Sequence, residues 1–384
     1  MILRIANSPR PYAWGSLTAI AELLGAEPSG EPEAELWLGA HPGSPSRIVE
    51  GAAEEDLFQW VQNHRPDARL PFLMKVLAAS RPLSLQAHPT PQQAREGFER
   101  ENAAGVPLEA PHRNYKDPFH KPELLLALSD EFRALSGFRP VAESRADLEE
   151  AADPRLAPLL ERLTGESALR DVFAWLIGGG DEVDGIVAAL TELSDDRSTR
   201  PGASAAWNTV QLLAAEYSGD PGIAISMLMH TIVLKAGEAI YLPAGNIHAY
   251  LEGLGIEVMA ASDNVLRGGL TPKHVDVPEL LRVLDFRSLP KPYVDPQRPQ
   301  RGVSIFRPDV PDFVLTVIEN HAAIAGVEIS TSGAAIVLAL SGHIEVSEGV
   351  SSEAATRGDV LFTDASTITV RGSGRAVVGR VGDR

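Results

Sequence analysis

The sequence predicts a mainly β protein with a helical insertion: two jelly-roll β-barrel units and one all-α unit. Glycines (33) and prolines (29) separate short apolar runs over much of the chain, which is typical of many strands joined by turns. Between residues 141 and 225 the apolar side chains instead recur at helical spacing, and towards the C-terminus they alternate with polar ones. We therefore expect one barrel from residues 1–140 and 226–290, a helical unit at 141–225, and a second barrel at 291–384.

The first segment, residues 1–140, contains two predicted helices among its strands. One covers Leu17 to Leu24. The other follows Thr90, a suitable N-cap residue, and starts with Pro91, whose missing N–H and fixed φ fit the first helical turn. We expect this second helix to run from Gln92 to Asn102.

The helical unit is predicted from four apolar groups that share a 3.6-residue periodicity. The groups are Leu156, Leu159, Leu160 and Leu163; Val172, Phe173 and Leu176; Ile186, Val187, Leu190 and Leu193; and Trp207, Val210, Leu213 and Tyr217. We expect four or five helices here and assign no chemistry to them. Strand patterning returns at Ile232. A helix from Val277 to Leu284 and a Pro-rich linker at 285–300 then lead to the alternating strands of the second barrel.

The composition excludes several kinds of site and partner. A formal net charge of −18 repels nucleic acid phosphates and anionic lipid, so we expect neither nucleic acid nor a membrane as a partner. The absence of cysteine rules out disulfides, thiolate nucleophiles and thiolate metal ligands. The N-terminus has no apolar stretch typical of a secretion signal, and no apolar run is long enough to span a bilayer. We expect a cytoplasmic monomer or weak homo-oligomer.

A spaced motif opens at Gly237 and continues through Pro243, Gly245 and His248 to Glu252. It resembles the second cupin motif, in which Gly and Pro form tight turns and a histidine begins an inward-facing strand. A weaker copy lies near the C-terminus. Its residues Gly358, Asp364, Ser366 and Thr369 align with Gly237, Pro243, Gly245 and His248. Because the copy has no histidine, we expect the second cupin barrel to hold no metal.

Three further side chains complete a candidate metal site with His248. Gln86 and His88 are two residues apart, so on a strand both face the same way. The candidate acid is Glu123, which is not nearby in sequence and begins an apolar run. Two nitrogens and two oxygens suit zinc, with other borderline divalent ions as the alternative. Spacing alone leaves open that these are hydrogen-bonded structural side chains.

Several segments together resemble the type I mannose-6-phosphate isomerases. The stretch HAYLEGLGIEVMAASDNVLRGGLTPK, residues 248–273, is similar to the most diagnostic segment of that family, with Gly268 in place of its usual Ala. YKDPFHKPE, residues 115–123, resembles a second signature, with Phe119 where Asn is usual. LMKVLAASRPLSLQAHP, PYAWGS and ELWLGAHPGSPS also match, so the resemblance covers roughly residues 9–285.

The resemblance implies a pair of cupin barrels with a helical domain, and zinc held by Gln86, His88, Glu123 and His248. It also implies that mannose 6-phosphate and fructose 6-phosphate are interconverted. Such a reaction moves a proton between C1 and C2 through an enediol, and a divalent metal polarises the sugar oxygen.

Further residues of the matching segments receive expected roles. For catalysis we expect Arg267, which can bind phosphate or an enediolate bidentately, with Glu257 as proton carrier and Lys273 as its partner. The expected substrate-binding residues are Lys75, Ser84, Lys121, Tyr250 and Asp263. For Arg267 the alternative is a surface ion pair with Asp263.

Two alternative functions remain open at this point. Another cupin sugar-phosphate isomerase, acting on glucose 6-phosphate, would use the same residue types. A non-catalytic sugar-binding cupin would need neither the complete ligand set nor Arg267.

Overall fold

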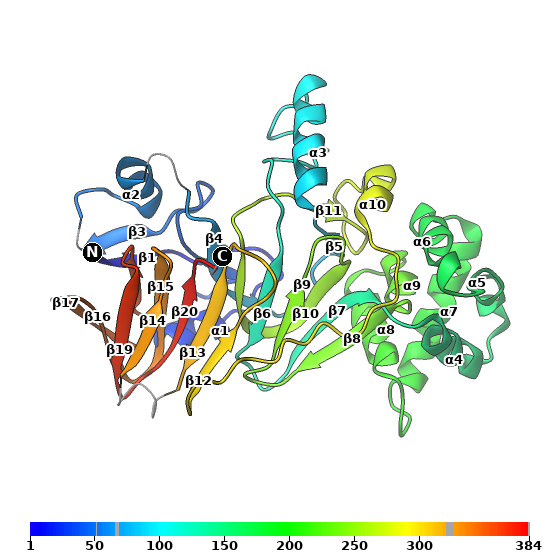
Figure 1. Ribbon diagram of the computed structural model, residues 1–384. Coiled ribbons are helices and arrows are strands. Elements are labelled where there is room, and N and C mark those ends of the chain that lie inside the picture. Colours follow the sequence, from blue (N-terminus) through cyan, green and yellow to red (C-terminus); the bar gives the residue numbers. More distant parts are fainter. Residues whose placement is uncertain (51, 66–68, 320–325, 383–384) are drawn as a thin grey trace.

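The computed structural model describes residues 1–50, 52–65, 69–319 and 326–382. The strands in these ranges form antiparallel sheets of seven, nine and four strands, which agrees with the predicted mainly β class. Figure 1 shows the two C-terminal sheets at one end, the nine-stranded sheet in the centre and a group of helices at the other end. No helix in the described ranges has both the length and the apolar character needed to cross a bilayer.

The nine-stranded sheet is organised by one long strand, β10, residues His248–Ala260. Its first half pairs with β5 and β7, and its second half pairs with β4 and β6. The other strands of the sheet are β2 (Glu35–Leu38), β4 (Phe72–Ala79), β5 (Gln86–Ala87), β6 (Glu123–Ala127), β7 (Phe132–Phe138), β8 (Met229–Leu234), β9 (Ala239–Leu242) and β11 (Leu266–Arg267). All the predicted metal ligands except His88, which follows β5, begin or lie within these strands.

The seven-stranded sheet combines residues from both ends of the chain. Its strands are β1 (Ile2–Ala6), β3 (Arg47–Glu50), β12 (Val303–Phe306), β13 (Val314–Ile318), β15 (Ala335–Ser341), β18 (Val360–Thr363) and β20 (Arg375–Arg380). β1 pairs with β18 in the register Ile2 to Thr363. The predicted boundaries grouped residues 1–6 and 47–50 with residues 226–290, whereas β1 and β3 belong to the same sheet as C-terminal strands. Alternation of apolar residues identifies a strand but not its partner.

The four-stranded sheet consists of β14 (Val327–Ser330), β16 (His343–Glu348), β17 (Ser351–Thr356) and β19 (Thr367–Gly372). All four of these strands, together with strands of the seven-stranded sheet, enclose an apolar cluster that includes Ile344, Val346, Ile368 and Val370. The C-terminal part of the molecule is therefore filled by aliphatic side chains.

Four helices accompany the sheets: α1 (Ala19–Leu24), α2 (Leu57–His64), α3 (Pro91–Ala103) and α10 (Val277–Val283). The prediction for α3 is confirmed, because the Thr90 side chain accepts from Gln93 N and the Gln93 side chain accepts from Thr90 N. This reciprocal pair satisfies two N–H groups that a helix start leaves without partners.

Residues 141–226 form six α-helices rather than the four or five expected. They are α4 (Val141–Ala151), α5 (Ala157–Arg162), α6 (Leu169–Gly178), α7 (Asp181–Arg197), α8 (Ala205–Glu216) and α9 (Gly222–Ser226), with 3₁₀ turns at Pro154–Leu156 and Glu166–Ala168. The extra helix is α9. All five of its residues are buried, so it carries no amphipathic periodicity for a sequence reading to detect.

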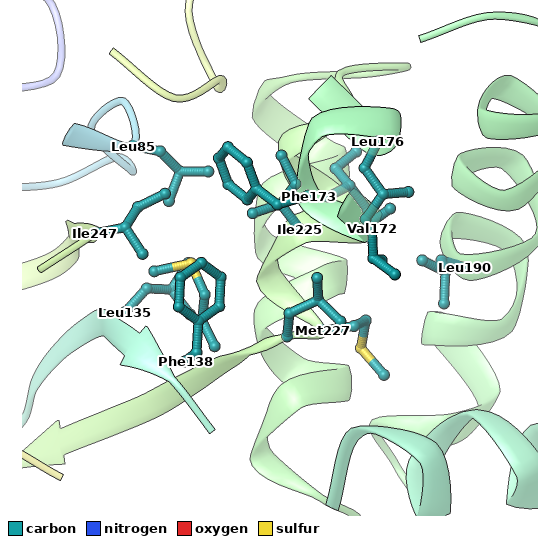
Figure 2. Close-up of a cluster of buried hydrophobic side chains, with 14 of the residues drawn as sticks. Leu85, Leu135, Phe138, Val172, Phe173, Leu176, Leu190, Ile225, Met227 and Ile247 are labelled. Carbon is teal, nitrogen blue, oxygen red and sulfur yellow. The ribbon is translucent and has the colours of Figure 1, made fainter. Parts of the chain in front are cut away.

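The helices pack against the nine-stranded sheet through one continuous apolar cluster. Figure 2 shows Leu85, Leu135 and Ile247 from the sheet side facing Phe173 and Ile225 of the helices. Ala87, Ala249 and Leu266 belong to the same cluster. Because neighbouring residues of a strand point to opposite faces, Gln86, His248 and Arg267 face away from the helices. The helical segment thus supports the site from behind.

Candidate metal centre

Three side chains from separate strand ends meet inside the nine-stranded sheet. His88 follows β5, Glu123 begins β6, and His248 begins β10. Each is no more than 3% exposed, and one donor atom from each lies within 4.8 Å of the others. Glu123 Oε1 is 3.2 Å from His88 Nε2, and Glu123 Oε2 is 3.3 Å from His248 Nε2. Donors about 2.0–2.2 Å from a tetrahedral zinc ion would be separated by about 3.4 Å, so these spacings fit.

In the neutral form of each imidazole, the hydrogen bond made by Nδ1 leaves Nε2 without a proton. His88 Nδ1 lies 2.7 Å from Asn264 O, and His248 Nδ1 lies 3.1 Å from Asn246 O. A carbonyl accepts only, so each Nδ1 must carry the hydrogen. His88 Nε2 has no hydrogen-bond partner in its buried position. Burial also lowers the pKa of His88 to about 4, which keeps it neutral at pH 7.

Two nitrogen lone pairs therefore point at a carboxylate, and this arrangement is repulsive unless a cation lies between them. Burial alone would raise the pKa of Glu123, but the charge of Lys121 holds it well below its usual value. Glu123 is thus ionised. The donor set of two neutral imidazoles and one carboxylate is one that divalent zinc prefers.

Gln86 is placed by the strand register rather than by a bond to the cluster. It lies opposite His248 across β5 and β10, and opposite Arg267 across β5 and β11. It lines a cavity of about 40 Å³ together with Glu123 and His248. The cavity has space for an ion with little water, and Gln86 forms part of its wall.

Lys121 and Tyr250 also surround Glu123. Lys121 Nζ is 2.9 Å from Glu123 Oε1, and the Tyr250 hydroxyl donates to Glu123 Oε2 at 3.3 Å. Burial, followed by Glu257 and Glu123, raises the pKa of Tyr250 well above its usual value. Tyr250 therefore stays neutral and can act as a donor at the cavity.

Glu257 has a different partner from the one predicted. Its Oε2 is 2.9 Å from Lys75 Nζ, and Lys75 Nζ is 3.5 Å from Glu35 Oε1. Burial raises the pKa of Glu257 above its usual value, and Lys75 offsets this only in part. Lys273 is instead exposed, and its pKa is lowered by partial burial and by the charge of Arg267. Among the described residues Glu257 pairs with Lys75 rather than with the expected Lys273, because pairing across β4 and β10 puts Lys75 directly opposite Glu257.

A larger hollow of about 590 Å³ shares Glu35, Lys75 and Lys121 with the small cavity. Arg267 lines it and has no carboxylate partner among the described residues, so the alternative of an ion pair with Asp263 is not supported. Burial lowers the pKa of Arg267. Asp263 also lines this hollow, and its Oδ2 lies 3.5 Å from His41 Nε2.

Two predicted residues lie outside these hollows. Ser84 is half-buried but is absent from the described residues that line either one, because the chain has not yet entered β5 at that position. Lys273 is likewise absent from both linings. The alternation argument that placed Ser84 on the face of Gln86 required a strand that starts earlier than β5 does.

The structure adds residues that sequence reasoning missed. Glu35 and Trp37 lie on β2 within the matching segment ELWLGAHP, and the Trp37 indole N–H donates to Glu35 Oε2 at 2.8 Å. Arg10 lines the larger hollow. It lies 5.7 Å and 5.6 Å from the ring centres of Tyr12 and Trp37, with no carboxylate partner among the described residues. The segment resemblance signalled this region without assigning roles in it.

Asn264 is a further residue that sequence reasoning missed, and it makes several hydrogen bonds close to the cluster. It is fully buried. Its side-chain oxygen accepts from Lys116 N at 2.7 Å, and its amide nitrogen donates to Asp117 O at 2.7 Å and to Phe119 O at 2.8 Å. Its backbone carbonyl is the one that accepts from His88. Asn264 thus ties His88 to the loop that leads into Glu123.

The geometry defines a strand-built centre for one divalent cation, with two imidazoles and a carboxylate as donors and a cationic hollow beside it. Residues 2–141 match the family described as phosphomannose isomerase type I, catalytic domain. The chain is 38% identical to a mannose-6-phosphate isomerase of Escherichia coli (strain K12), with 97% of each chain covered. It is 32% identical to that of Bos taurus, with 92% and 91% covered.

A solved mannose 6-phosphate isomerase, bound with zinc and yttrium, superposes with a TM-score of 0.88 at 34% identity and full coverage of both chains. The chain therefore belongs to the type I phosphomannose isomerase family, and the resemblance stated from its sequence is confirmed.

Proposed function

We propose that this protein is a zinc-dependent aldose–ketose isomerase that interconverts mannose 6-phosphate and fructose 6-phosphate through an enediol. The observation that carries this function is the convergence of two unprotonated imidazole nitrogens on the Glu123 carboxylate. The relatives named mannose-6-phosphate isomerase, and the solved one that binds zinc, support the same assignment.

Gln86, His88, Glu123 and His248 would hold the zinc ion. When bound, the ion supplies Lewis-acid polarisation of a sugar oxygen without any redox change. Without an ion, the charged side chains that line the small cavity are two lysines and three glutamates. A divalent cation would turn their net formal charge of about −1 into about +1, which suits an anionic substrate.

Glu257 is the residue we assign to proton transfer between C1 and C2. Its pKa is raised by burial, so it lies nearer the working pH than that of an exposed glutamate, as a general acid–base group requires. Lys75, rather than Lys273, holds the Glu257 carboxylate in place. The Tyr250 hydroxyl, within the same cavity, would donate to a sugar oxygen.

The phosphate end of the substrate would lie in the larger hollow. Lys75 and Lys121 are each paired with a buried carboxylate, so neither offers an uncompensated charge. Arg267 and Arg10 line the hollow without such partners among the described residues. A planar guanidinium can bind phosphate with two parallel hydrogen bonds, and we therefore assign phosphate binding to these two arginines.

The architecture that we propose keeps two cupin barrels and an all-α unit. Residues 226–290 join the first barrel with most of residues 7–140, and residues 141–225 form the helical unit. Residues 291–384 form the C-terminal barrel without metal, to which β1 and β3 contribute strands. The oligomeric state, monomer or weak homo-oligomer, and the cytoplasmic location stay predictions.

A coupled assay for fructose 6-phosphate formed from mannose 6-phosphate tests the function. We expect turnover that a chelator abolishes and zinc restores, with about one zinc per chain. Preference for glucose 6-phosphate in the same assay would favour the other cupin isomerase. Sugar-phosphate binding without turnover of either epimer would favour the non-catalytic cupin and contradict our proposal.

A further inference from the structure

The connection between α8 and α9 touches the backbone of the site at two places, although we assigned no chemistry to the helical segment. The Tyr217 hydroxyl donates to Pro82 O at 2.7 Å, on the chain that leads into β5. Asp220 contacts the chain just after β11, which carries Arg267. Both contacts cross from the helices to the strands that hold site residues.

The Asp220 carboxylate gathers three backbone N–H groups. Its Oδ1 accepts from Gly222 N at 2.7 Å and from Leu270 N at 2.9 Å, and its Oδ2 lies 3.4 Å from Thr271 N. One side chain of the helical segment thus holds both its own connection and the turn at residues 268–271. Hydrogen bonds that backbone N–H groups donate to a carboxylate are stronger than those that they donate to an uncharged acceptor.

The turn that Asp220 holds is strained. Leu270 has φ +54°, in the left-handed region that residues with a Cβ adopt only at a cost, and Gly269 before it has φ +117°. The Leu270 side chain is fully buried. It packs so closely on Gly222 that a Cβ there would lie 2.7 Å from Leu270 Cγ. Such strain persists only where surrounding contacts hold it, and it is concentrated at functional sites.

Arg267 depends on this turn for its direction. The two-residue strand β11 pairs with β5 through Arg267 and Gln86, and Gly268 N donates to Leu85 O at 2.8 Å. Among the described residues no carboxylate fixes the guanidinium of Arg267. The backbone on either side must therefore aim it, and beyond β11 that backbone is anchored by Asp220.

We propose that Asp220 is a positioning residue for the isomerase reaction, which acts by holding the strained turn that aims Arg267 at the substrate phosphate. This inference rests on the proposed function, because it takes Arg267 as the phosphate anchor. It also gives the helical unit a role in catalysis. The unit supplies Asp220, which anchors the turn after Arg267, although the Arg267 side chain lies on the opposite face of the sheet.

Three variants separate positioning from general stability. Asp220→Ala removes all three contacts, whereas Asp220→Asn keeps the Oδ1 acceptor for Gly222 and Leu270. Ser204→Ala is the control, since Ser204 caps α8 in the same unit and is outside the described contacts of the turn. We expect Asp220→Ala to lower kcat/KM on the order of 100-fold. Asp220→Asn and Ser204→Ala should stay within about threefold, and all three should keep their zinc.

Two further readouts test the route through Arg267. In an Arg267→Ala background, adding Asp220→Ala should change kcat/KM less than about threefold, because the residue it positions is gone. Amide hydrogen exchange in the peptide 266–273 should be faster in Asp220→Ala than in Ser204→Ala. The inference would be overturned if Asp220→Ala lowered kcat/KM equally with and without Arg267→Ala. Unchanged hydrogen exchange in the peptide 266–273 would also overturn it.

The outcomes distinguish this inference from the proposed function. If the unaltered, zinc-loaded protein does not turn over mannose 6-phosphate, the proposed function fails. In that case the affinity for fructose 6-phosphate, measured by calorimetry, replaces kcat/KM in the comparison of Asp220→Ala with and without Arg267→Ala. The hydrogen-exchange measurement is unaffected. Loss of zinc in Asp220→Ala would also contradict the inference, since the metal ligands would then have moved.

Discussion

Two parts of the molecule use the same backbone device around different interiors. In the nine-stranded sheet, Gly237 (φ +89°) opens β9, and residues 243–247 lead to His248 at the start of β10. In the C-terminal sheets, Gly358 (φ +88°) opens β18, and residues 364–366 lead into β19. In the first part β10 begins with the cluster residue His248, whereas in the second part β19 contributes Ile368 and Val370 to an aliphatic core.

The difference lies in the inward-facing side chains. β10 places His248, Tyr250 and Glu257 at the polar cavity. β19 points Ile368 and Val370 inward, and Thr369, the residue that aligns with His248, is only half-buried between them. The comparison teaches that the glycine turn and its strands build a scaffold, and that the chemistry depends on which side chains occupy its interior face.

Removing His248 should have the largest effect on zinc content and turnover. It makes the nine-stranded sheet resemble the C-terminal sheets, which have no histidine at the aligned position. His248→Ala removes one of three buried donors, so we expect loss of zinc and a fall in turnover of roughly a thousandfold or more. Metal analysis and the coupled assay measure the two effects. Thr369→His is the matched control and should gain no metal; zinc bound stoichiometrically at Thr369→His would break the comparison.

Arg267→Ala should separate substrate binding from metal binding within the first unit. We expect zinc content to stay near one per chain while kcat/KM falls roughly 100- to 1,000-fold, since an uncompensated cation is lost from the hollow. Intact turnover in this variant would remove Arg267 from the proposed mechanism. Titrating fructose 6-phosphate into the variant shows whether the loss lies in binding.

The metal-free protein should lose stability as the pH falls from about 6.5 to 4. The pKa of His88 is lowered to about 4 in the folded state, so the unfolded chain binds the proton first and folding is weakened over this window. The expected loss is about 3 kcal/mol. Below pH 4.3 or so, protonation of Glu123, whose folded pKa is depressed, should add to it. Urea unfolding as a function of pH measures both.

His88→Gln should flatten this pH profile between 6.5 and 4. His343→Gln is the control from the other unit, because the His343 imidazole on β16 is exposed, and it should leave the profile unchanged. A profile that is flat in the unaltered protein would contradict the assignment of His88 as a buried neutral imidazole.

Alanine substitutions at the two turn glycines, Gly237 and Gly358, should lower the free energy of unfolding by different amounts. At Gly237 a Cβ would meet no atom within 4 Å, so Gly237→Ala should lose about 1 kcal/mol for its left-handed backbone. At Gly358 a Cβ would lie 2.4 Å from Leu24 O, so Gly358→Ala should lose about 3 kcal/mol. Urea midpoints compare the two variants. Equal losses would show that the C-terminal turn relaxes freely.

Local signals in the sequence predicted much of this molecule. Thr90 and Pro91 located α3 because an N-cap residue followed by proline at the first helical position marks the start of a helix. The motif around His248 located β9 and β10, and the spacing of Gln86 and His88 located β5, although that strand ends at Ala87. Glu123 was a candidate because it begins an apolar run, but no local pattern links it to Gln86 and His88 about 35 positions earlier, and the family resemblance supplied that link.

What the sequence could not predict depends on which strands become neighbours. Lys75 is one of the expected substrate-binding residues, but β4 pairs with β10 and β2, which puts the carboxylates of Glu257 and Glu35 beside it. Asp220 lies in a helical segment with no motif. Its role depends on a turn 50 residues later in the chain, and sequence spacing carries no such information.

The pairing of β1 with β18 has a consequence for how this chain is made. Residues 2–5 leave the ribosome long before residues 360–363, their partners, have been translated. Until then the edges of β1 and the side chains of Ile2, Leu3 and Ile5 have no native cover from that strand, so nascent chains should need chaperone protection throughout most of synthesis. An insertion or cleavage within the first six residues would act far away, by leaving an open strand edge in the C-terminal sheet.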